Sequence, residues 1–290
     1  MKIKNITLGS DPETFLQKLG SIISPQYIVW GTKDQPFNLD DGYFMQRDNM
    51  ALEFNIPPVI TVDDFVKAID LGIYKCIEAL PENVNIKVMP SFVFPKEMID
   101  NDYDALVFGC DPDYNAYTNS KNPKPCSDNK YLRSCGGHIM LGYTGVSEEL
   151  NIEIIKRLDL YLGLPSVILD PDTERRQLYG KAGCFRHKDF GVEYRTLSNY
   201  WLQSPELVAH VAQNTLFAAA SINSGLVIPD NDQMYIESAI NNNNHGLALE
   251  LIHNYSIPMP VKQYNKTDNL IYYKHYGVST ATTAVASHTT

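Results

Sequence analysis

The sequence has no long basic run and no long apolar run, and each absence excludes a class of protein. No stretch of Lys or Arg exceeds two residues, and the formal net charge of the 290 residues is −10. Because contacts to a phosphate backbone require clustered Lys and Arg, we expect no nucleic acid as the main partner. No apolar segment reaches transmembrane length and the start lacks a signal-peptide core, so we expect neither a membrane partner nor export.

Cysteine is scarce and follows no metal-binding pattern. The five cysteines, at positions 76, 110, 126, 135 and 184, include no CxxC pair. An odd number without metal-ligand spacing is typical of reduced thiols, so we expect a cytoplasmic protein. Cys135 and Cys184 lie within candidate site motifs, which leaves a catalytic thiol as a minor alternative.

The most informative stretch is 190–199, with the sequence FGVEYRTLSN. Residues two apart on a strand point to one face, so Glu193 and Arg195 are expected side by side, with Val192 and Tyr194 on the packed face. A carboxylate binds Mg²⁺ and an arginine neutralises phosphate oxygens, so the pair indicates half of a metal–nucleotide site. The alternative is a solvated ion pair, which is the commoner meaning of an isolated ExR.

A second acidic pair, Asp11 and Glu13, follows the alternating run 3–8. On a strand these carboxylates would also share a face. The alternative is a helix start, with Ser10 or Asp11 as the N-cap and Pro12 at the first helical position.

Two further segments place polar groups on expected strands. In 50–55, Glu53 shares the polar face of an alternating strand with Asn55; the alternative is a plain wet face. Paired glycines precede His138 and allow close approach of a backbone or ligand. The alternative for His138 is a hydrogen-bonded core residue.

Arginine is concentrated between residues 175 and 195, where glycines stand at 180, 183 and 191. Guanidinium groups match phosphate and carboxylate oxygens, so we expect at least two arginines to face a site. The alternative is pairing with local acids such as Asp172, Glu174 and Asp189. Lys33 is a weaker candidate for contact with an anion.

The order of the expected elements favours an α+β fold with mostly antiparallel strands, because no regular βαβ alternation is present. Capped apolar periodicity predicts helices over 61–80, 147–162 and 204–220. Strands are expected at 84–88 and 105–108, a turn at 241–244, and a loop at 115–129 that either covers the site or is a surface excursion. We expect one catalytic domain over 1–260 and a C-terminal extension over 261–290, partly flexible from about residue 279.

Together these motifs resemble a known family, the phage-type carboxylate–amine (COOH–NH2) ligases, or amidoligases. That family belongs to the superfamily of glutamine synthetase and glutamate–cysteine ligase. The resemblance covers roughly residues 5–225 and rests on the following segments in order: 9–13 (GSDPE), 48–54 (DNMALEF), 108–113 (FGCDPD), 135–139 (CGGHI), and 175–176 (RR) through 195–198 (RTLS).

The resemblance implies a curved antiparallel sheet that forms a funnel-like active site, with helices packed on its outer face. It implies ATP and two or three Mg²⁺ or Mn²⁺ ions as cofactors. By motif position it implies these metal ligands: Asp11, Glu13, Glu53, His138 and Glu193. It implies Glu193, Arg195 and Arg186 as catalytic residues, and these ATP or phosphate contacts: Arg175, Arg176, Arg186, Arg195 and Lys33.

This sequence departs from the better-known enzymes at two places. Asp11 stands where glutamate is common, and no second glutamate lies near Glu53. Gln46 or Asp48 is available for that place, which leaves the number of metals open.

The implied function is ATP-dependent amide formation through an acyl phosphate, with small-molecule or peptide carboxylates and amines as substrates. A homo-oligomer is compatible with the sequence, and the host cytoplasm is the expected location if a phage encodes the protein. One alternative is a guanidino (phosphagen-type) kinase of the same superfamily. The other is a non-catalytic nucleotide-binding phage protein; the complete set of site residues argues against it.

Overall fold

The computed structural model of the chain describes residues 2–102, 105, 113–123 and 128–260. The expected C-terminal extension, 261–290, lies outside the described residues. So do most of the strand expected at 105–108 and the cysteines at 110 and 126.

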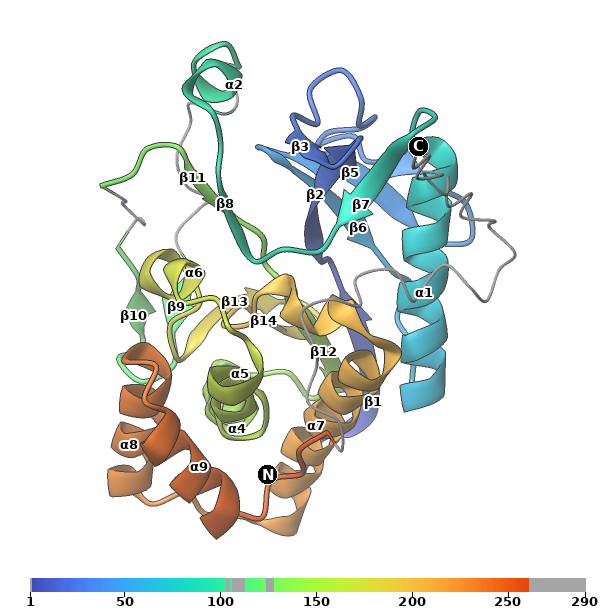
Figure 1. Cartoon of the computed structure of the whole chain (residues 1–290). Coiled ribbons are helices and arrows are strands. Elements are labelled where there is room, and N and C mark those ends of the chain that lie inside the picture. Colours follow the sequence, from blue (N-terminus) through green and yellow to red (C-terminus); the bar gives the residue numbers. More distant parts are fainter. Residues whose placement is uncertain (1, 103–104, 106–112, 124–127, 261–290) are drawn as a thin grey trace, which may run out of the picture.

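Two antiparallel sheets form the frame of the molecule (Figure 1). The first has the order β1-β12-β14-β13-β9-β10, with bounds Lys4–Ser10, Ile139–Thr144, Gly191–Tyr194, Cys184–Lys188, Tyr114–Asn115 and Ser120–Lys121. The second has the order β3-β2-β6-β5-β4, with β7 also paired to β2; the bounds are Ser21–Ile23, Glu13–Lys18, Ala51–Asn55, Phe44–Asp48, Phe37–Asn38 and Val84–Lys87. A smaller pair joins β8 (Ser91–Val93) to β11 (Leu132–Ser134).

The two sheets meet where β1 runs into β2. Only Asp11 and Pro12 separate these strands. On one side of the junction the Leu8 amide donates to the Val59 carbonyl (2.7 Å), and on the other the Glu13 amide donates to the Gly136 carbonyl (2.9 Å). The segment is therefore a strand crossing between sheets, and the alternative of a helix start at Ser10–Asp11 is wrong.

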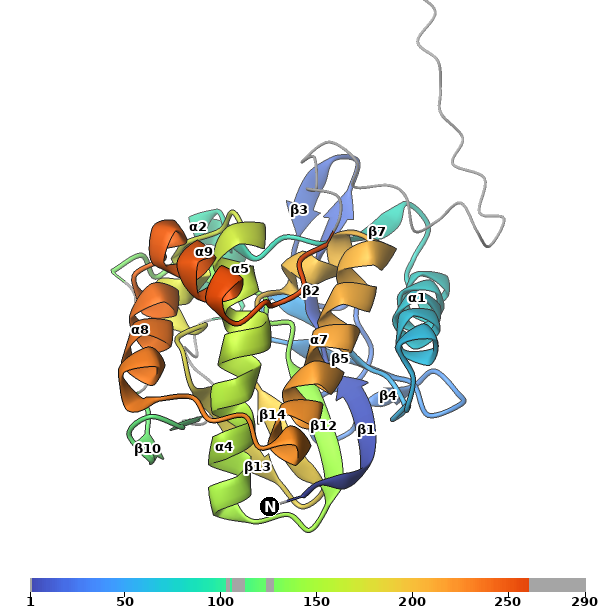
Figure 2. The same cartoon turned by 90° about the horizontal axis from the view of Figure 1, so that it is seen from below.

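Capped helices cover the sheets as the sequence predicts. Thr61 accepts from the Asp64 amide and begins α1 (Val62–Ala79), which packs against β6 and β7. Ser147 caps α4 (Glu148–Leu158), and Ser204 caps α7 (Pro205–Ser224), whose first residue is proline. Figure 2 shows α4 and α7 lying over β12, β13 and β14, so these helices shield one face of the first sheet.

The remaining helices complete two smaller hydrophobic clusters. One cluster packs α5 against the C-terminal pair; the bounds are Leu164–Leu169 for α5, Asp230–Asn241 for α8 and His245–Asn254 for α9. The other gathers Phe15, Phe92 and Phe94 in edge-to-face contacts below α2 (Lys96–Asp100). Short α6 (Glu174–Leu178) and the 3₁₀ helix Asn199–Gln203 border the site.

The predicted α+β class with mostly antiparallel pairing is confirmed, and every strand pair in the described ranges is antiparallel. The expected helices and the turn at 241–244 are also confirmed. The loop expected at 115–129 is partly wrong, because β9 and β10 form a short hairpin within it. Of the helices in the described ranges, none combines the length and hydrophobicity needed to cross a bilayer.

A buried carboxylate ties α4 to the end of β14. After Leu158 the helix widens into a π-helical turn, Asp159–Gly163, and Asp159 is fully buried. It accepts hydrogen bonds from the Tyr194 hydroxyl (2.6 Å) and the Gly183 amide (2.6 Å), with the Thr196 hydroxyl at 3.4 Å. Tyr194 and Thr196 flank Arg195, so Asp159 fixes the backbone that carries this arginine.

Asp159 also predicts a dependence of stability on pH. Burial raises its pKa from 3.8 to about 7, against the opposing effect of its hydrogen bonds. Between these values the folded protein holds a proton that the unfolded chain has lost, so this stabilisation declines as pH rises. We expect the free energy of unfolding of the wild type, relative to Asp159→Asn, to fall from about pH 4 to about pH 7 and then level off. Urea unfolding across this range checks it, and a difference that does not change with pH contradicts it.

Candidate active site

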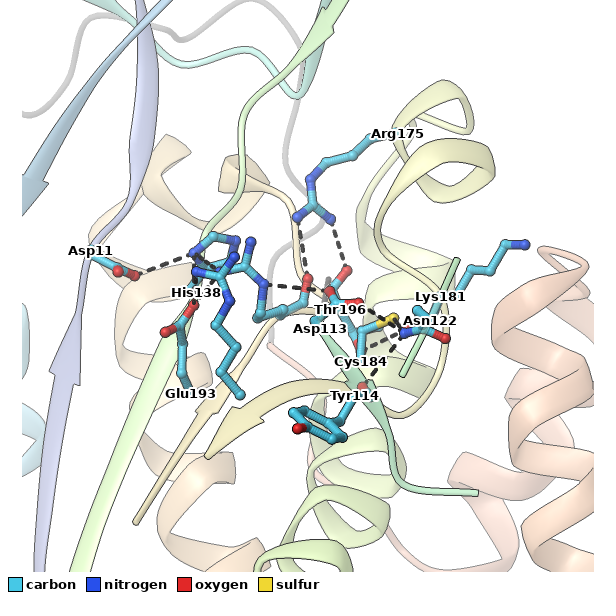
Figure 3. A network of polar contacts seen from close by, with 12 residues as sticks. Asp11, Asp113, Tyr114, Asn122, His138, Arg175, Lys181, Cys184, Glu193 and Thr196 are labelled. Atoms are coloured by element: carbon cyan, nitrogen blue, oxygen red, sulfur yellow. Dashed lines mark hydrogen bonds and ion pairs between the residues drawn. The ribbon is translucent and has the colours of Figure 1, made fainter. Parts of the chain in front are cut away.

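Residues from both sheets converge at the junction to form two groups of metal-ligating side chains. In each group the ligand atoms lie within 4.8 Å of one another. The first group is Asp11, His138 and Glu193, which Figure 3 shows pointing toward one another. The second group is Glu13, Asp48 and Glu53. All five sequence-predicted metal ligands therefore lie in one of the two groups.

The first group is buried and held by close contacts. His138 Nδ1 lies 3.3 Å from Asp11 Oδ1 and 3.7 Å from Glu193 Oε1. Arg195 Nη1 donates to Glu193 Oε1, as expected for residues that share a strand face. The Ser10 hydroxyl donates to the His138 carbonyl at 2.6 Å and fixes β12 against β1.

The second group is set by strand register. Glu53 on β6 lies opposite Glu13 on β2 and opposite Gln46 on β5. Asp48 lies at the end of β5, two residues beyond Gln46, and completes the group. The fold brings both residues that were available beside Glu53 to this group: Asp48 adds a third carboxylate, and the Gln46 side chain hydrogen-bonds Glu53.

Burial and mutual repulsion perturb the titration of these groups. Burial raises the pKa of Asp11 well above its usual range, and the nearby Glu193 carboxylate adds to the rise. Burial, with Glu13 and Asp48 adding to it, raises the pKa of Glu53 to about 8. Burial and then the adjacent Arg195 charge lower the pKa of His138 well below its usual value. The imidazole is therefore neutral and able to ligate a metal.

Glu193 behaves differently because cations surround it. Burial acts to raise its pKa, but Arg195 and then Lys188 outweigh burial, so the pKa is lowered. Lys188 Nζ lies 2.6 Å from Oε2, and Arg186 Nη1 lies 3.9 Å from Oε1. Glu193 thus stays ionised at the centre of the site.

Lys188 is a site residue to which the sequence analysis gave no role, and so is Asp113, whose Oδ2 lies 3.5 Å from Arg195 Nε. The position of Lys188 was readable from the strand period, because it lies two residues beyond Arg186 and so shares its face. The register confirms this, with Arg186 paired to Glu193 and Lys188 to Gly191 across the β13–β14 hairpin.

The arginines at 175 and 176 serve the backbone and the helical core. The Arg175 guanidinium donates to the carbonyls of Thr196 (3.0 Å) and Arg195 (3.2 Å), as Figure 3 shows for Thr196. Arg176 contacts Ser166 on α5 at 3.4 Å and lines neither site cavity. Arg175 borders the larger cavity and holds the segment that carries Arg195.

Two cavities open on the metal-ligating groups. One of about 880 Å³ extends past the loop at Tyr27 and Trp30, and one of about 610 Å³ extends past Phe44 and Lys188. The two share the following lining residues: Glu13, Lys33, Asp48, His138 and Arg195. Two ligands in the two cavities would therefore meet at the same group of residues.

These groups fit a hard divalent cation. Carboxylate oxygens with a single neutral imidazole suit Mg²⁺ or Mn²⁺. Asp11 Oδ1 is buried without a hydrogen-bond donor among the described residues, although buried carboxylate oxygens normally have one. A bound cation would satisfy that oxygen.

The buried thiols do not suit nucleophilic catalysis. Cys135 and Cys184 are free and buried, and burial raises the pKa of Cys184 to about 12 and that of Cys135 well above its usual value. Protonated thiols are poor nucleophiles.

Part of the chain matches a known family. Residues 128–241 match the model described as phage phiEco32-like COOH.NH2 ligase-type 2. This stretch carries the His138 strand and the β13–β14 hairpin, but it excludes Asp11, Glu13, Asp48 and Glu53. The chain is therefore similar to carboxylate–amine ligases of that type, but the match covers less than half of its length.

Other comparisons add little. No curated protein sequence matches the chain. A structure described as a bifunctional glutathione synthetase from Pasteurella multocida is similar with a TM-score of 0.49 and 11% identity, over 87% of this chain. The chain spans 44% of that protein, and a likeness of this degree carries no argument about function.

Close packing at Gly137 positions the histidine strand. A Cβ atom on Gly137 would overlap the Ser198 carbonyl oxygen and Trp201 Nε1, and Trp201 Nε1 donates to the Gly137 carbonyl at 3.2 Å. A side chain here must displace the 3₁₀ helix that backs the site.

We therefore expect Gly137→Ala to lower the free energy of unfolding by about 1–3 kcal/mol, the usual cost of overpacking. Trp201 fluorescence should shift at the same time. The matched control is Gly246→Ala in α9, where the nearest contact of a new Cβ is an ordinary 3.6 Å. The control should be neutral or stabilising by up to about 1 kcal/mol. Equal stability of the two variants in urea unfolding would contradict the packing argument.

Proposed function

We propose that this protein is an ATP- and Mg²⁺-dependent carboxylate–amine ligase that forms an amide bond through an acyl phosphate. One observation carries the proposal: two groups of metal-ligating side chains and Arg195 lie where two cavities meet. Such a centre suits a reaction that brings a nucleotide and a carboxylate together. The ligase-family match over residues 128–241 supports the same class of reaction.

The chain's own residues have separable roles in this reaction. Arg195, held from behind by Arg175 and the Asp159 network, lies within reach of an anionic group at the junction and would neutralise the transferring phosphoryl group. Arg186, which lines the smaller cavity, would hold a second anionic oxygen. Mg²⁺ on the two ligand groups would supply charge neutralisation at the phosphate oxygens.

The proposed reactants follow from this arrangement. A carboxylate is a poor acyl donor, so transfer of the γ-phosphoryl group activates it for attack by an amine, with ADP and phosphate as products. The substrates are small-molecule or peptide carboxylates and amines. The glutamine synthetase-like architecture is part of the proposal, supported by helix-backed antiparallel sheets that meet at the ligand groups. A cytoplasmic location is supported by the free, buried cysteines.

Metal and nucleotide should stabilise the protein together. Each ligand group places carboxylates in a desolvated space, so a divalent cation should relieve repulsion and then attract phosphate. We expect Mg²⁺ with ATP to raise the melting temperature more than the sum of the two separate shifts. Scanning calorimetry checks this, and an absence of ATP binding at millimolar Mg²⁺ would contradict the ligase proposal.

The chemistry is tested at Glu193 and Arg195. We expect Glu193→Gln to fold and to lower turnover at least ~10²-fold, the scale for losing one aligned electrostatic group. Arg195→Lys should also be severe, because an ammonium cannot replace the planar fork. Glu250→Gln, on an exposed turn of α9, is the matched control and should retain full activity. The readout is ATP-dependent hydroxamate formation from hydroxylamine and a panel of carboxylic acids.

The same assay separates the alternatives. Near-normal hydroxamate formation by Glu193→Gln would contradict the proposed role of Glu193 in the reaction. ATP consumption without hydroxamate from any acid, but with phosphorylation of a guanidine, would assign the kinase reaction instead. Nucleotide binding without turnover in the wild type would indicate a binding protein.

A further inference from the structure

Each of the two ligand groups has a lysine bound to one of its carboxylates. Lys188 Nζ lies 2.6 Å from Glu193 Oε2 in the first group, and Lys33 Nζ lies 2.7 Å from Asp48 Oδ2 in the second. The lysines come from unrelated segments, β13 and the loop before β4, yet each makes the same kind of contact. The pattern of one ammonium for each group is the observation that carries the inference.

The ammonium groups occupy oxygens that a metal would need. In the first group Arg195 Nη1 already contacts Glu193 Oε1, so Oε2 is the oxygen left for a cation, and Lys188 lies on it. A divalent ion binds carboxylate oxygens at about 2.0–2.6 Å, which would bring it close to the ammonium. Like charges at that separation repel in a partly buried site, so the metal and the ammonium compete.

Lys188 and Lys33 can move away from their carboxylates more easily than Arg195 can, because their side chains are more exposed. The side chains of Lys188 and Lys33 are 31% and 50% exposed, whereas that of Arg195 is 7% exposed. Both lysines line the smaller cavity, into which a four-carbon side chain can turn. An ammonium displaced from its carboxylate therefore stays in the space that an anionic substrate would enter.

We propose that Lys188 and Lys33 are built-in counter-cations, which neutralise the two ligand groups in the metal-free protein and turn toward an anionic substrate when divalent metal displaces them. The inference rests on the proposed metal sites and extends them to the order of loading. Metal binding prepares two cations for phosphate or carboxylate oxygens. By linkage, an anion held by those lysines strengthens metal binding to the same degree.

The test is Mn²⁺ binding by calorimetry to protein freed of metal with a chelator. Removing a competitor should tighten binding, so Lys188→Met and Lys33→Met should each lower the Kd of one class of Mn²⁺ site at least about fivefold, the lower end of typical coupling. Lys67→Met, on an exposed position of α1 that lines neither cavity, makes the same change in net charge and should leave the Kd unchanged. Lys188→Arg keeps the charge and should not tighten binding.

The second measurement is ADP binding to the Mn²⁺-saturated proteins. Lys188→Met and Lys33→Met should bind ADP at least about fivefold more weakly than Lys67→Met, because the released cation is missing. ADP affinity equal to that of the control would overturn the release step.

Unchanged or weaker Mn²⁺ binding in the methionine variants would overturn the competition. If Lys188→Met does not fold, which circular dichroism reports, Lys188→Gln keeps a polar side chain and takes its place.

These outcomes are distinct from failure of the ligase proposal. If the wild type binds Mn²⁺ but makes no hydroxamate, the ligase proposal is contradicted and the proposed role of the lysines is not. If the wild type binds no Mn²⁺, both the proposed metal sites and the proposed role of the lysines are contradicted.

Discussion

The constraint on which the structure depends is the burial of like charges at the junction of two sheets. Five carboxylates gather there; Asp11, Glu53 and Glu193 are buried, and Glu13 and Asp48 are half-buried. Two features reduce the repulsion: Asp11 and Glu53 have strongly raised pKa values, and Glu193 is paired with Arg195 and Lys188. A buried charge costs free energy unless it is paired, so these features lower the cost of holding the carboxylates together.

The rest of the fold holds these groups in fixed positions. The first sheet carries His138 and Glu193 on neighbouring strands, and α4 and α7 cover its other face. Three further side chains hold the site in place. Asp159, Trp201 and Arg175 each make hydrogen bonds to backbone or hydroxyl groups beside it. Asp159 and Trp201 line neither site cavity and Arg175 borders the larger one, and each holds groups that flank a residue of the site.

Local patterns in the sequence predicted most of the elements and long-range pairing decided the rest. The helices were readable because Thr61, Ser147 and Ser204 cap apolar periodicity, and Glu193 with Arg195 was readable because a strand has a period of two. That Asp48 and Gln46 both lie beside Glu53 could not be predicted, because it depends on how β5 pairs with β6. Arg175 and Arg176 resembled anion-binding residues by type, but their partners are carbonyl and hydroxyl oxygens remote in sequence. The residue type alone does not reveal whether a guanidinium binds an anion or a carbonyl or hydroxyl oxygen of the protein.

The β13–β14 hairpin has a consequence for the order in which the chain folds. Its turn joins strands that place Arg186 and Lys188 within seven residues of Glu193, so these contacts close short loops. Contact with Asp11 requires closing a loop of well over a hundred residues, which is much slower. A nascent hairpin can therefore pair Glu193 with cations before the contact with Asp11 forms, so that Asp11 approaches a carboxylate whose charge is already neutralised.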